Sequence, residues 1–195
     1  ETAVRAVNAE KFLLFYHHGA MRCVYHDEIG YRRSEKIIAV SRHQAEKLCA
    51  FRPKYAHKIV TVHNLVDAER IREKGSEPVQ ESFLPERFNI VSCGRVSREK
   101  GMDLAVEACA KLVAAGYKHI HWWIVGGGPA EAEVREKIAQ LGMEQYMTML
   151  GMQENPYPYI DAADLYVQPS RFEAFGLTIA EALVLEKPVL STDNG

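Results

Sequence analysis

The chain has 195 residues, of which 47% are hydrophobic and 26% are charged, so it can bury an ordinary globular core. Its formal net charge of −2 excludes the large basic field that nucleic-acid-binding proteins carry. No apolar run approaches the roughly 18 residues that a membrane-spanning helix needs. The cysteines lack C-x-x-C spacing, which favours free buried thiols over disulfides or a metal site; they are Cys23, Cys49, Cys93 and Cys109.

Residues 1–74 predict part of an α/β domain. Short apolar strands are expected at 12–16, 36–40 and 58–62, and helices near 22–35 and 42–51 separate them. Three strands indicate only the later half of such a domain. His17 and His18 follow the first strand, but adjacent residues of an extended chain point to opposite sides, so the pair does not predict a metal site.

Residues 75–87 (GSEPVQESFLPER) are polar and contain two prolines, which is typical of a linker between domains. The sequence therefore predicts a partial N-terminal domain at 1–74 and a second domain at 88–195. The chain starts without methionine and stops directly after a strand. We expect it to be a piece of a longer protein, with the second domain truncated at its C-terminal end.

From residue 88 onward, strands and amphipathic helices alternate. Strands are expected at 88–93, 119–125, 146–150, 164–168 and 188–192; helices are expected at 101–115, at 130–141, shortly before 164 and at 177–185. This order predicts a Rossmann-like parallel sheet covered by helices on both faces. Ligands of such sheets bind at the carboxyl ends of the strands.

Two cations lie in the loop after the first strand of this sheet. Gly94 and Arg95 follow the strand directly, and Lys100 precedes the next helix. Arginine and lysine at this place suit the oxygens of a phosphate, where they would stabilise negative charge that develops during bond breaking. The alternative is a set of solvated charges in a polar loop, since Arg98 and Glu99 are neighbours.

The glycines at 126–128 open the next loop. The run does not match the dinucleotide-binding motif G-x-G-x-x-G, because Glu131 stands where the third glycine belongs. The run predicts a tight turn that lets the backbone approach a ligand, with Gly127 at its centre. Gly151 and Met152 end the following strand in a similar way. We expect these two loops to contribute shape and backbone groups.

The segment SRFEAFGLTIAEAL carries two glutamates, Glu173 and Glu181, eight residues apart. Gly176 separates them, and the helix expected from Leu177 begins with N–H groups that have no partner within the helix. Such a helix start is an anion site. A carboxylate, an anion site and a second carboxylate would suit a sugar, a diphosphate and a ribose. The alternative is a pair of ordinary surface glutamates.

Residues 164–195 resemble the donor-binding signature of the retaining glycosyltransferases of family 4, which have two facing Rossmann-like domains (the GT-B fold). The resemblance includes Pro169, Ser170, Glu173, Phe175, Gly176, Glu181, Ala182 and Pro188. The segment GRVSREKG matches the G-R-x4-K pattern of that family, and residues 37–48 and 58–71 are similar to the end of its N-terminal domain. Ala174 departs from the pattern, because family members usually carry glycine there.

This resemblance implies roles for individual residues. Glu173 would contact the donor sugar, and Glu181 would bind ribose hydroxyls. The diphosphate would lie against Arg95, Lys100 and the N–H groups of Phe175, Gly176 and Leu177. The loops at Gly127 and Met152 would line the base pocket beside Gly94. His18 falls where related enzymes often place an acceptor-side histidine, although a structural histidine explains it equally well.

The resemblance implies a retaining glycosyltransferase that moves a sugar from a nucleoside diphosphate sugar to an acceptor hydroxyl, in cell-surface polysaccharide or glycolipid synthesis. No metal or other cofactor is expected. The partners would be the nucleotide sugar and a sugar or lipid-linked acceptor. The location would be cytoplasmic, and peripheral membrane contact of the full-length protein is left open. The fragment itself is expected to be inactive. Alternatives are an epimerase-like enzyme of the same fold and a non-catalytic nucleotide-sugar-binding module.

Overall fold

The computed structural model describes residues 13–16, 28–79 and 83–193. The chain divides into two compact units: the first comprises the residues up to Leu65 together with Glu173–Phe175, and the second comprises Val66–Phe172 and the residues from Gly176 onward. The boundary therefore lies ahead of the linker predicted at 75–87, and residues 66–74 do not belong to the N-terminal unit as the sequence analysis had it. Their packing, described below, gives the reason.

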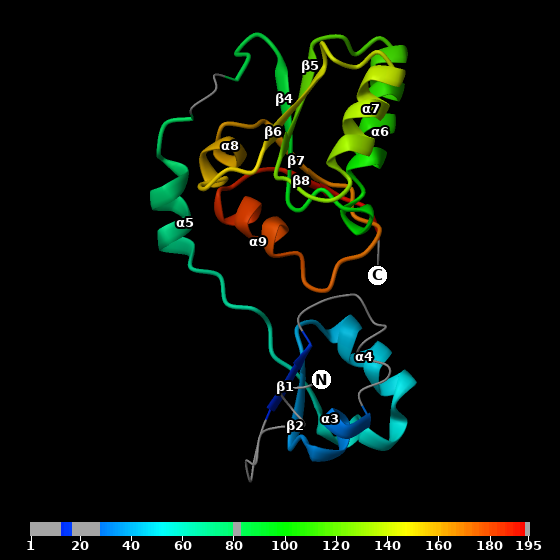
Figure 1. Ribbon diagram of the computed structural model, residues 1–195. Helices are drawn as coiled ribbons and strands as arrows, with labels where there is room; N and C mark the ends of the chain where they lie inside the picture. Colours follow the sequence, from blue (N-terminus) through cyan, green and yellow to red (C-terminus); the bar gives the residue numbers. More distant parts are fainter. Residues whose placement is uncertain (1–12, 17–27, 80–82, 194–195) are drawn as a thin grey trace. The chain divides into compact units, whose positions relative to one another are not determined.

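The first unit is a three-stranded parallel sheet with helices packed on it (Figure 1). Its strands are β1 (Leu13–Tyr16), β2 (Lys36–Ala39) and β3 (Ile59–Thr61), in the order β1-β2-β3. The helices are α3 (Glu28–Arg33), α4 (Arg42–Phe51) and the 3-10 helix η1 (Pro53–Lys58). Ser41 caps α4, since its side chain accepts a hydrogen bond from the Gln44 N–H. The three predicted strands are thus confirmed.

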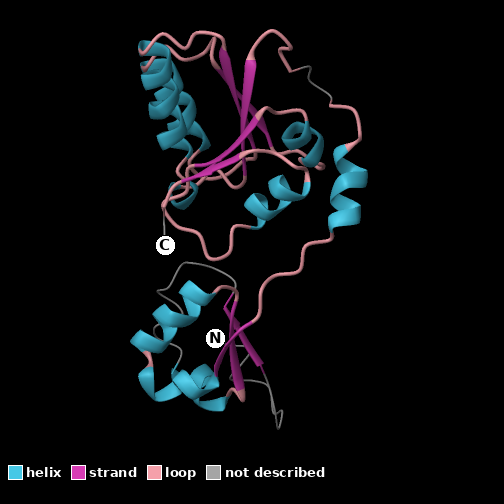
Figure 2. Cartoon of the chain, turned by 180° about the vertical axis from the view of Figure 1, so that it is seen from behind, coloured by secondary structure: helices cyan, strands magenta, loops and turns pink. Residues whose placement is uncertain are grey.

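The second unit has a five-stranded parallel sheet in the order β6-β5-β4-β7-β8. Figure 2 draws its strands in magenta and the helices around them in cyan. Its strands are β4 (Phe88–Cys93), β5 (Ile120–Val125), β6 (Met147–Gly151), β7 (Leu165–Gln168) and β8 (Val189–Ser191). Its helices are α5 (Ala68–Gly75), η2 (Arg98–Lys100), α6 (Met102–Ala114), α7 (Glu131–Gln140), α8 (Tyr157–Asp161) and α9 (Leu177–Val184). Every element predicted for 88–192 is present, within two residues at each predicted end.

Helices cover both faces of this sheet. Helices α6 and α7 lie on one face, and α5, α8 and α9 lie on the other (Figure 1). Two adjacent tryptophans show the alternation of a strand: Trp122 belongs to the core on the α6 face, whereas Trp123 belongs to the core on the α8 face. The indole N–H of Trp122 donates to Ser92 Oγ at 3.0 Å, and that of Trp123 donates to Asn89 Oδ1 at 3.0 Å.

The segment predicted as a linker packs on the second unit. Ile71 of α5 is buried in the core on the α8 face, and Phe83 stacks on Trp123 with ring centroids 4.6 Å apart. A Cβ added to Gly75 would lie 2.7 Å from Leu185 Cδ2, so α5 approaches Leu185 closely at this glycine. Ile71 lies in the part predicted for the N-terminal domain, and the polar composition of 75–87 gives no sign that Phe83 packs on the second unit.

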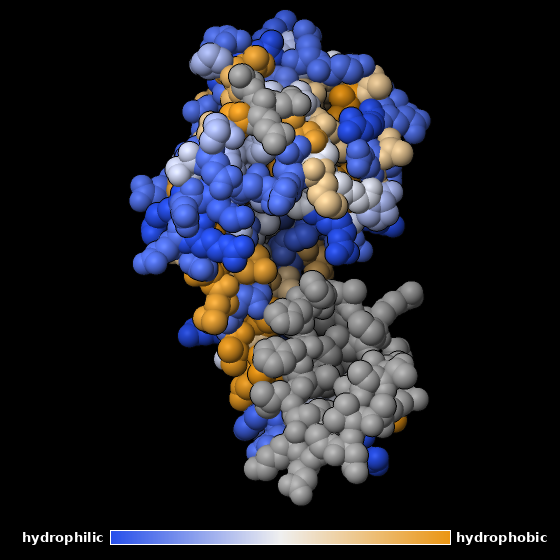
Figure 3. Space-filling view, turned by 60° about the vertical axis from the view of Figure 1, so that its left-hand side comes forward, coloured by the Kyte–Doolittle hydropathy of each residue, from blue (hydrophilic) through white to orange (hydrophobic). Residues whose placement is uncertain are grey.

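The strand order reverses beside β4. The chain proceeds from β4 to β5 and β6 on one side, and then crosses back to β7 and β8 on the other. The helices that follow β4 and β7 start on opposite faces, which is the arrangement at which doubly wound sheets bind their ligands. The described part of the chain contains no helix long and apolar enough to cross a membrane. On the side shown in Figure 3, the second unit presents a mainly hydrophilic surface.

Candidate functional site

The loops after β4 and β5 are joined through their backbones. The N–H of Gly94 donates to Val125 O at 2.9 Å, and the N–H of Val96 donates to Gly127 O at 3.0 Å. Gly126 has φ 135°, and a Cβ there would lie 2.0 Å from Gly94 O. Only glycine permits this approach. Gly126 is therefore explained by contact between loops, in addition to the predicted approach of this turn to a ligand.

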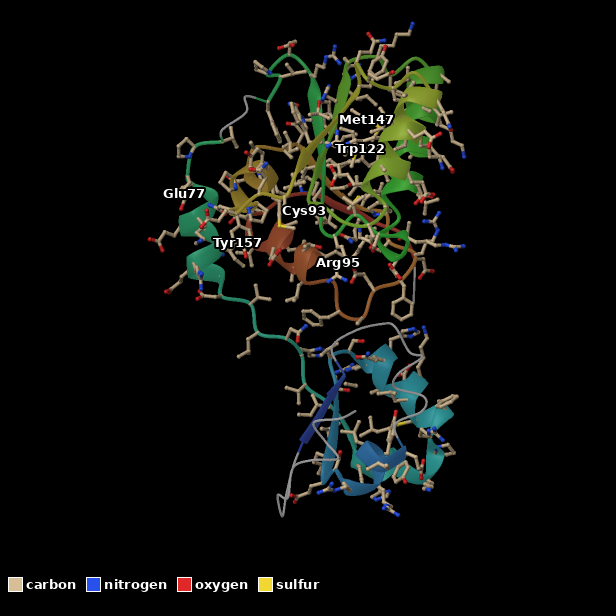
Figure 4. All side chains as sticks on the ribbon, viewed as in Figure 1. Glu77, Cys93, Arg95, Trp122, Met147 and Tyr157 are labelled. Atoms are coloured by element: carbon tan, nitrogen blue, oxygen red, sulfur yellow. The ribbon has the colours of Figure 1, made fainter. Side chains whose placement is uncertain are left out.

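A cleft of about 770 Å³ opens at the carboxyl ends of β4, β5 and β6. Its lining comprises Arg95, Ser97, Glu99, Gly127, Gly128, Pro129, Glu131, Gly151 and Met152. Three residues predicted for the site, Arg95, Gly127 and Met152, are thus brought together from three loops. Arg95 is exposed and lies just past Cys93 at the end of β4 (Figure 4). Met152 is 82% exposed. The volume suits a small-molecule ligand.

The loop after β7 is fastened to the loop that carries Lys100. The backbone N–H groups of Arg171 and Phe172 both donate to Glu99 O, at 2.7 and 3.2 Å. Gly101 has φ 63°, and a Cβ there would lie 2.1 Å from Pro169 O. These contacts hold the segment that leads to Glu173 against the segment that carries the second predicted cation. They bridge the point at which the strand order reverses.

An ion pair that the sequence did not predict reinforces this junction between the β4 and β7 loops. Arg171 Nη1 and Nη2 donate to Asp103 Oδ1 and Oδ2 at 2.6 and 2.7 Å, so the pair is bidentate. The Arg171 guanidinium holds the pKa of Asp103 below its ordinary value. Asp103 stands in the first turn of α6. Its partner is 68 residues away, and local spacing gives no signal for it.

Helix α9 begins at Gly176, which adopts φ 78° and ψ 54°. The first hydrogen bonds of the helix run from Ile179 N and Ala180 N to Gly176 O, at 3.0 and 3.1 Å. The N–H groups of Leu177 and Thr178 precede them and point out of the helix start. Glu173 lies in the loop three residues before Gly176 and is half-buried. The predicted loop, glycine and helix start are therefore in place.

Glu181 lies in the second turn of α9 and is half-buried. Burial raises the pKa of its carboxyl group, while a hydrogen bond from Tyr157 lowers it. The Tyr157 hydroxyl donates to Glu181 Oε1 at 3.2 Å. Local spacing in the sequence gives no signal for this contact, because the two residues stand 24 positions apart.

Cys93 links Glu181 to the β4 loop electrostatically. The thiol lies at the end of β4, where burial, followed by the negative charge of Glu181, raises its pKa to about 12. The positive charge of Lys100 opposes this shift. Both charges therefore lie near the same buried sulfur, although Lys100 does not line the cleft at Arg95. Cys49, Cys93 and Cys109 are free thiols, as predicted, and Cys23 lies outside the described residues.

Other predictions concern residues that the structure does not describe or does not group. His18 lies outside the described residues. Gly94 takes part in the loop contacts and does not line the cleft. Phe175 lies in the loop ahead of α9. Among the described residues, no group of three or more histidine, cysteine, aspartate or glutamate side chains could hold a metal ion.

Comparison with known protein families shows to which family the chain belongs. Residues 74–195 match the family described as glycosyl transferases group 1. The chain belongs to this family. Proteins similar to the chain include an uncharacterized glycosyltransferase of Methanocaldococcus jannaschii, which is 25% identical over 166 residues. The lipopolysaccharide core biosynthesis mannosyltransferase LpsB of Rhizobium meliloti is 30% identical over 175 residues.

The chain spans about half the length of these relatives. It aligns over 84% of its own length in both cases, but over only 41% of the first relative and 47% of the second. Among solved structures, HepE of Anabaena in complex with UDP superposes with a TM-score of 0.78, at 19% identity. The match covers 95% of this chain and 54% of HepE. The predicted fold class, α/β of the GT-B type, is confirmed.

Proposed function

We propose that this chain is the nucleotide-sugar-binding part of a retaining glycosyltransferase, which moves a sugar from a nucleoside diphosphate sugar to an acceptor hydroxyl. Membership of the group 1 family supports transfer of a glycosyl group. The presence of UDP in the structure of HepE supports a nucleotide-linked donor. The names of relatives such as LpsB favour an acceptor in polysaccharide or glycolipid synthesis.

One observation carries the proposal: the cleft at Arg95 lies at the strand ends beside the point where the strand order reverses. Nucleotides bind at this place in doubly wound sheets. The glycine loops at 126–128 and 151 provide a wall of backbone on which a flat base can lie. We assign the base to this wall and the diphosphate to the side of the cleft that carries Arg95.

The diphosphate becomes more negative when its bond to the sugar breaks. Arg95, Lys100 and the N–H groups at Phe175, Gly176 and Leu177 would meet this charge. Because they bind the departing diphosphate more strongly than the intact donor, they lower the barrier of transfer. These groups make a metal unnecessary in the proposed mechanism.

The two glutamates would hold the neutral parts of the donor. We assign Glu173 to the sugar hydroxyls and Glu181 to the ribose hydroxyls. Glu173 would orient the sugar so that the acceptor attacks on the face from which the diphosphate departs, and the anomeric configuration is kept. A covalent intermediate on Glu173 is the competing mechanism.

Binding tests the proposal first. A thermal-shift series with UDP, GDP and ADP should identify a nucleotide that stabilises the chain by about 2.7 kcal/mol at one hundred times its Kd. Arg95→Ala and Lys100→Ala should each weaken binding of that diphosphate about tenfold or more, and should barely affect the matching nucleoside, which lacks phosphates. Arg98→Ala is the matched control, because Arg98 stands in the same loop but lines a different cavity. If none of the three diphosphates stabilises the chain, the proposal is wrong.

Transfer tests it second. The full-length protein should hydrolyse or transfer the sugar of its donor, and Glu173→Ala and Lys100→Ala should abolish this activity. Residues 1–195 alone should bind nucleotide without turnover, since they span about half the length of their relatives. Glycosyl transfer that survives both substitutions in the full-length protein would exclude the assigned roles.

A further inference from the structure

We propose that Tyr157 is a positioning residue of the nucleotide site, which holds the Glu181 carboxylate in the orientation that accepts the ribose diol. This inference rests on the proposed role of Glu181. It adds a residue that neither the spacing of the sequence nor the family signature at 164–195 indicates.

The contact between the two side chains joins two helices. Tyr157 stands at the first position of α8, and its hydroxyl donates to Glu181 Oε1 in the second turn of α9 at 3.2 Å. A carboxylate can accept about four hydrogen bonds through its two oxygens. Among the described residues, Glu181 Oε2 has no hydrogen-bond donor. The tyrosine thus fixes one oxygen and leaves acceptor capacity for two neighbouring hydroxyl groups.

Tyr157 is itself held in place from two sides. Its backbone N–H donates to Asn155 Oδ1 at 3.2 Å. The Asn155 amide in turn donates to Lys74 O at 2.9 Å and to Glu77 Oε2 at 2.8 Å. Figure 4 shows Tyr157 and Glu77 on the side of the unit where α5 lies. The end of α5 therefore anchors the turn that presents the tyrosine, whose ring packs against the core on this face.

The surroundings of Glu181 offer little else to stabilise a charged carboxylate. The titratable groups that face it are Cys93 of β4, Tyr166 of β7 and Tyr157 of α8. The nearby positive charges act on the neighbours of Glu181: Arg70 acts on Tyr157, and Lys100 acts on Cys93. Burial disfavours the ionised form of Glu181, and Tyr157 is the group that opposes this effect. Loss of its hydroxyl should therefore disturb both the orientation of the carboxylate and its ionisation.

The chain provides a matched control two residues away. Tyr159 also lies in α8, and its hydroxyl contacts Gln153 Oε1 at 3.3 Å instead of Glu181. Tyr159→Phe and Tyr157→Phe remove the same atom from the same helix. Only the second removes a hydrogen bond from Glu181, so a difference between them reports on that bond.

The experiment measures binding by calorimetry, using whichever of UDP, GDP and ADP binds best, together with its 2′-deoxy analogue. Tyr157→Phe should weaken binding of the ribonucleotide about tenfold, the usual effect of losing a hydrogen bond to a charged group. Binding of the 2′-deoxy analogue should change less, because it lacks one of the hydroxyls that Glu181 would accept. Tyr159→Phe should behave like the wild type with both ligands.

The pH dependence separates positioning from a general loss of structure. Without the Tyr157 hydroxyl, Glu181 takes up its proton at a higher pH. The loss of ribonucleotide affinity should therefore be larger at pH 6 than at pH 8, whereas a merely structural defect would not follow pH in this way. In the double variant with Glu181→Ala, Tyr157→Phe should add no further loss, since its effect passes through Glu181.

The outcomes distinguish the role of Tyr157 from the proposed nucleotide-binding function on which it rests. Wild-type affinity in Tyr157→Phe at both pH values, together with weak binding in Glu181→Ala, would overturn the role of Tyr157 and leave the nucleotide site intact. Additive losses in the double variant would overturn it as well. Unchanged affinity in Glu181→Ala would instead refute the assignment of Glu181 to ribose.

Discussion

In the proposed site, Glu181 would serve ligand binding at the expense of stability. Its carboxyl group is half-buried, and desolvation raises its pKa. In a carboxyl group with a raised folded-state pKa, the stabilising contribution is present below the unfolded value and is lost as pH rises through the folded value. Above the folded-state pKa of Glu181 the free protein therefore carries an unfavourable charge, which ligand hydroxyls would compensate.

We expect Glu181→Gln to stabilise the free protein and to weaken the binding of nucleotide. The melting temperature of the variant should exceed that of the wild type by more at pH 8 than at pH 5, because glutamine does not ionise. Affinity for the preferred diphosphate should fall about tenfold, since a neutral amide is a weaker acceptor than a carboxylate. Thermal melts at the two pH values and calorimetry check this. A variant less stable than the wild type at pH 8 would contradict it.

At the scale of elements, three kinds of contact join the β4 loop to the β7 loop. Two backbone N–H groups share Glu99 O, Gly101 admits Pro169 O, and Arg171 reaches Asp103. The ion pair is partly exposed and contributes modestly. The close approach at Gly101 has no flexible neighbour that could yield, because the opposing atom belongs to the backbone.

We expect Gly101→Ala to destabilise the protein by at least about 2 kcal/mol, because it adds a backbone clash to the strain of a left-handed residue. Gly142→Ala is a closely matched control. Gly142 has φ 65°, against 63° at Gly101, but no atom lies within 4 Å of its Cβ position. It should lose only about 1 kcal/mol. Urea denaturation measures both, and equal losses would show that the contact at Pro169 does not matter.

The periodicity of the sequence predicted the helices and strands well, but it did not predict which side chains contact one another. Alternation of apolar strands and helices places β4 to β8 within a residue or two, and the rule of strand ends brings Arg95, Gly127 and Met152 to one cleft. Contacts such as Tyr157 with Glu181 and Arg171 with Asp103 depend on which strands are neighbours. Strand order follows from packing of the whole sheet, so local spacing carries no signal for it.

At the scale of the whole molecule, α5 and the segment after it belong to the core of the second unit. The sequence placed a linker at 75–87 because glutamates, serine and prolines dominate there. Ile71, Phe83 and Leu84 are nevertheless packed against the face that carries Trp123 and α8. A few apolar side chains at the right intervals are enough to dock such a segment, whatever its average polarity.

We therefore expect residues 66–195 to unfold cooperatively, and residues 88–195 to be much less stable. Each lost burial of a side chain such as Ile71 or Phe83 should cost about 1.5–3 kcal/mol. Urea unfolding followed by tryptophan fluorescence is suited to this comparison, because Phe83 stacks on Trp123. Equal unfolding midpoints for the two chains would mean that the docked segment contributes nothing.

The shared acceptor at Glu99 has a consequence for mutational tolerance. The carbonyl that receives both N–H groups belongs to the backbone, so most side chains at position 99 would preserve the junction. Proline at 171 or 172 would remove a donor that no substitution elsewhere restores. A survey of natural or laboratory variants should accordingly find wide chemical freedom at 99 and a strict exclusion of proline at 171 and 172.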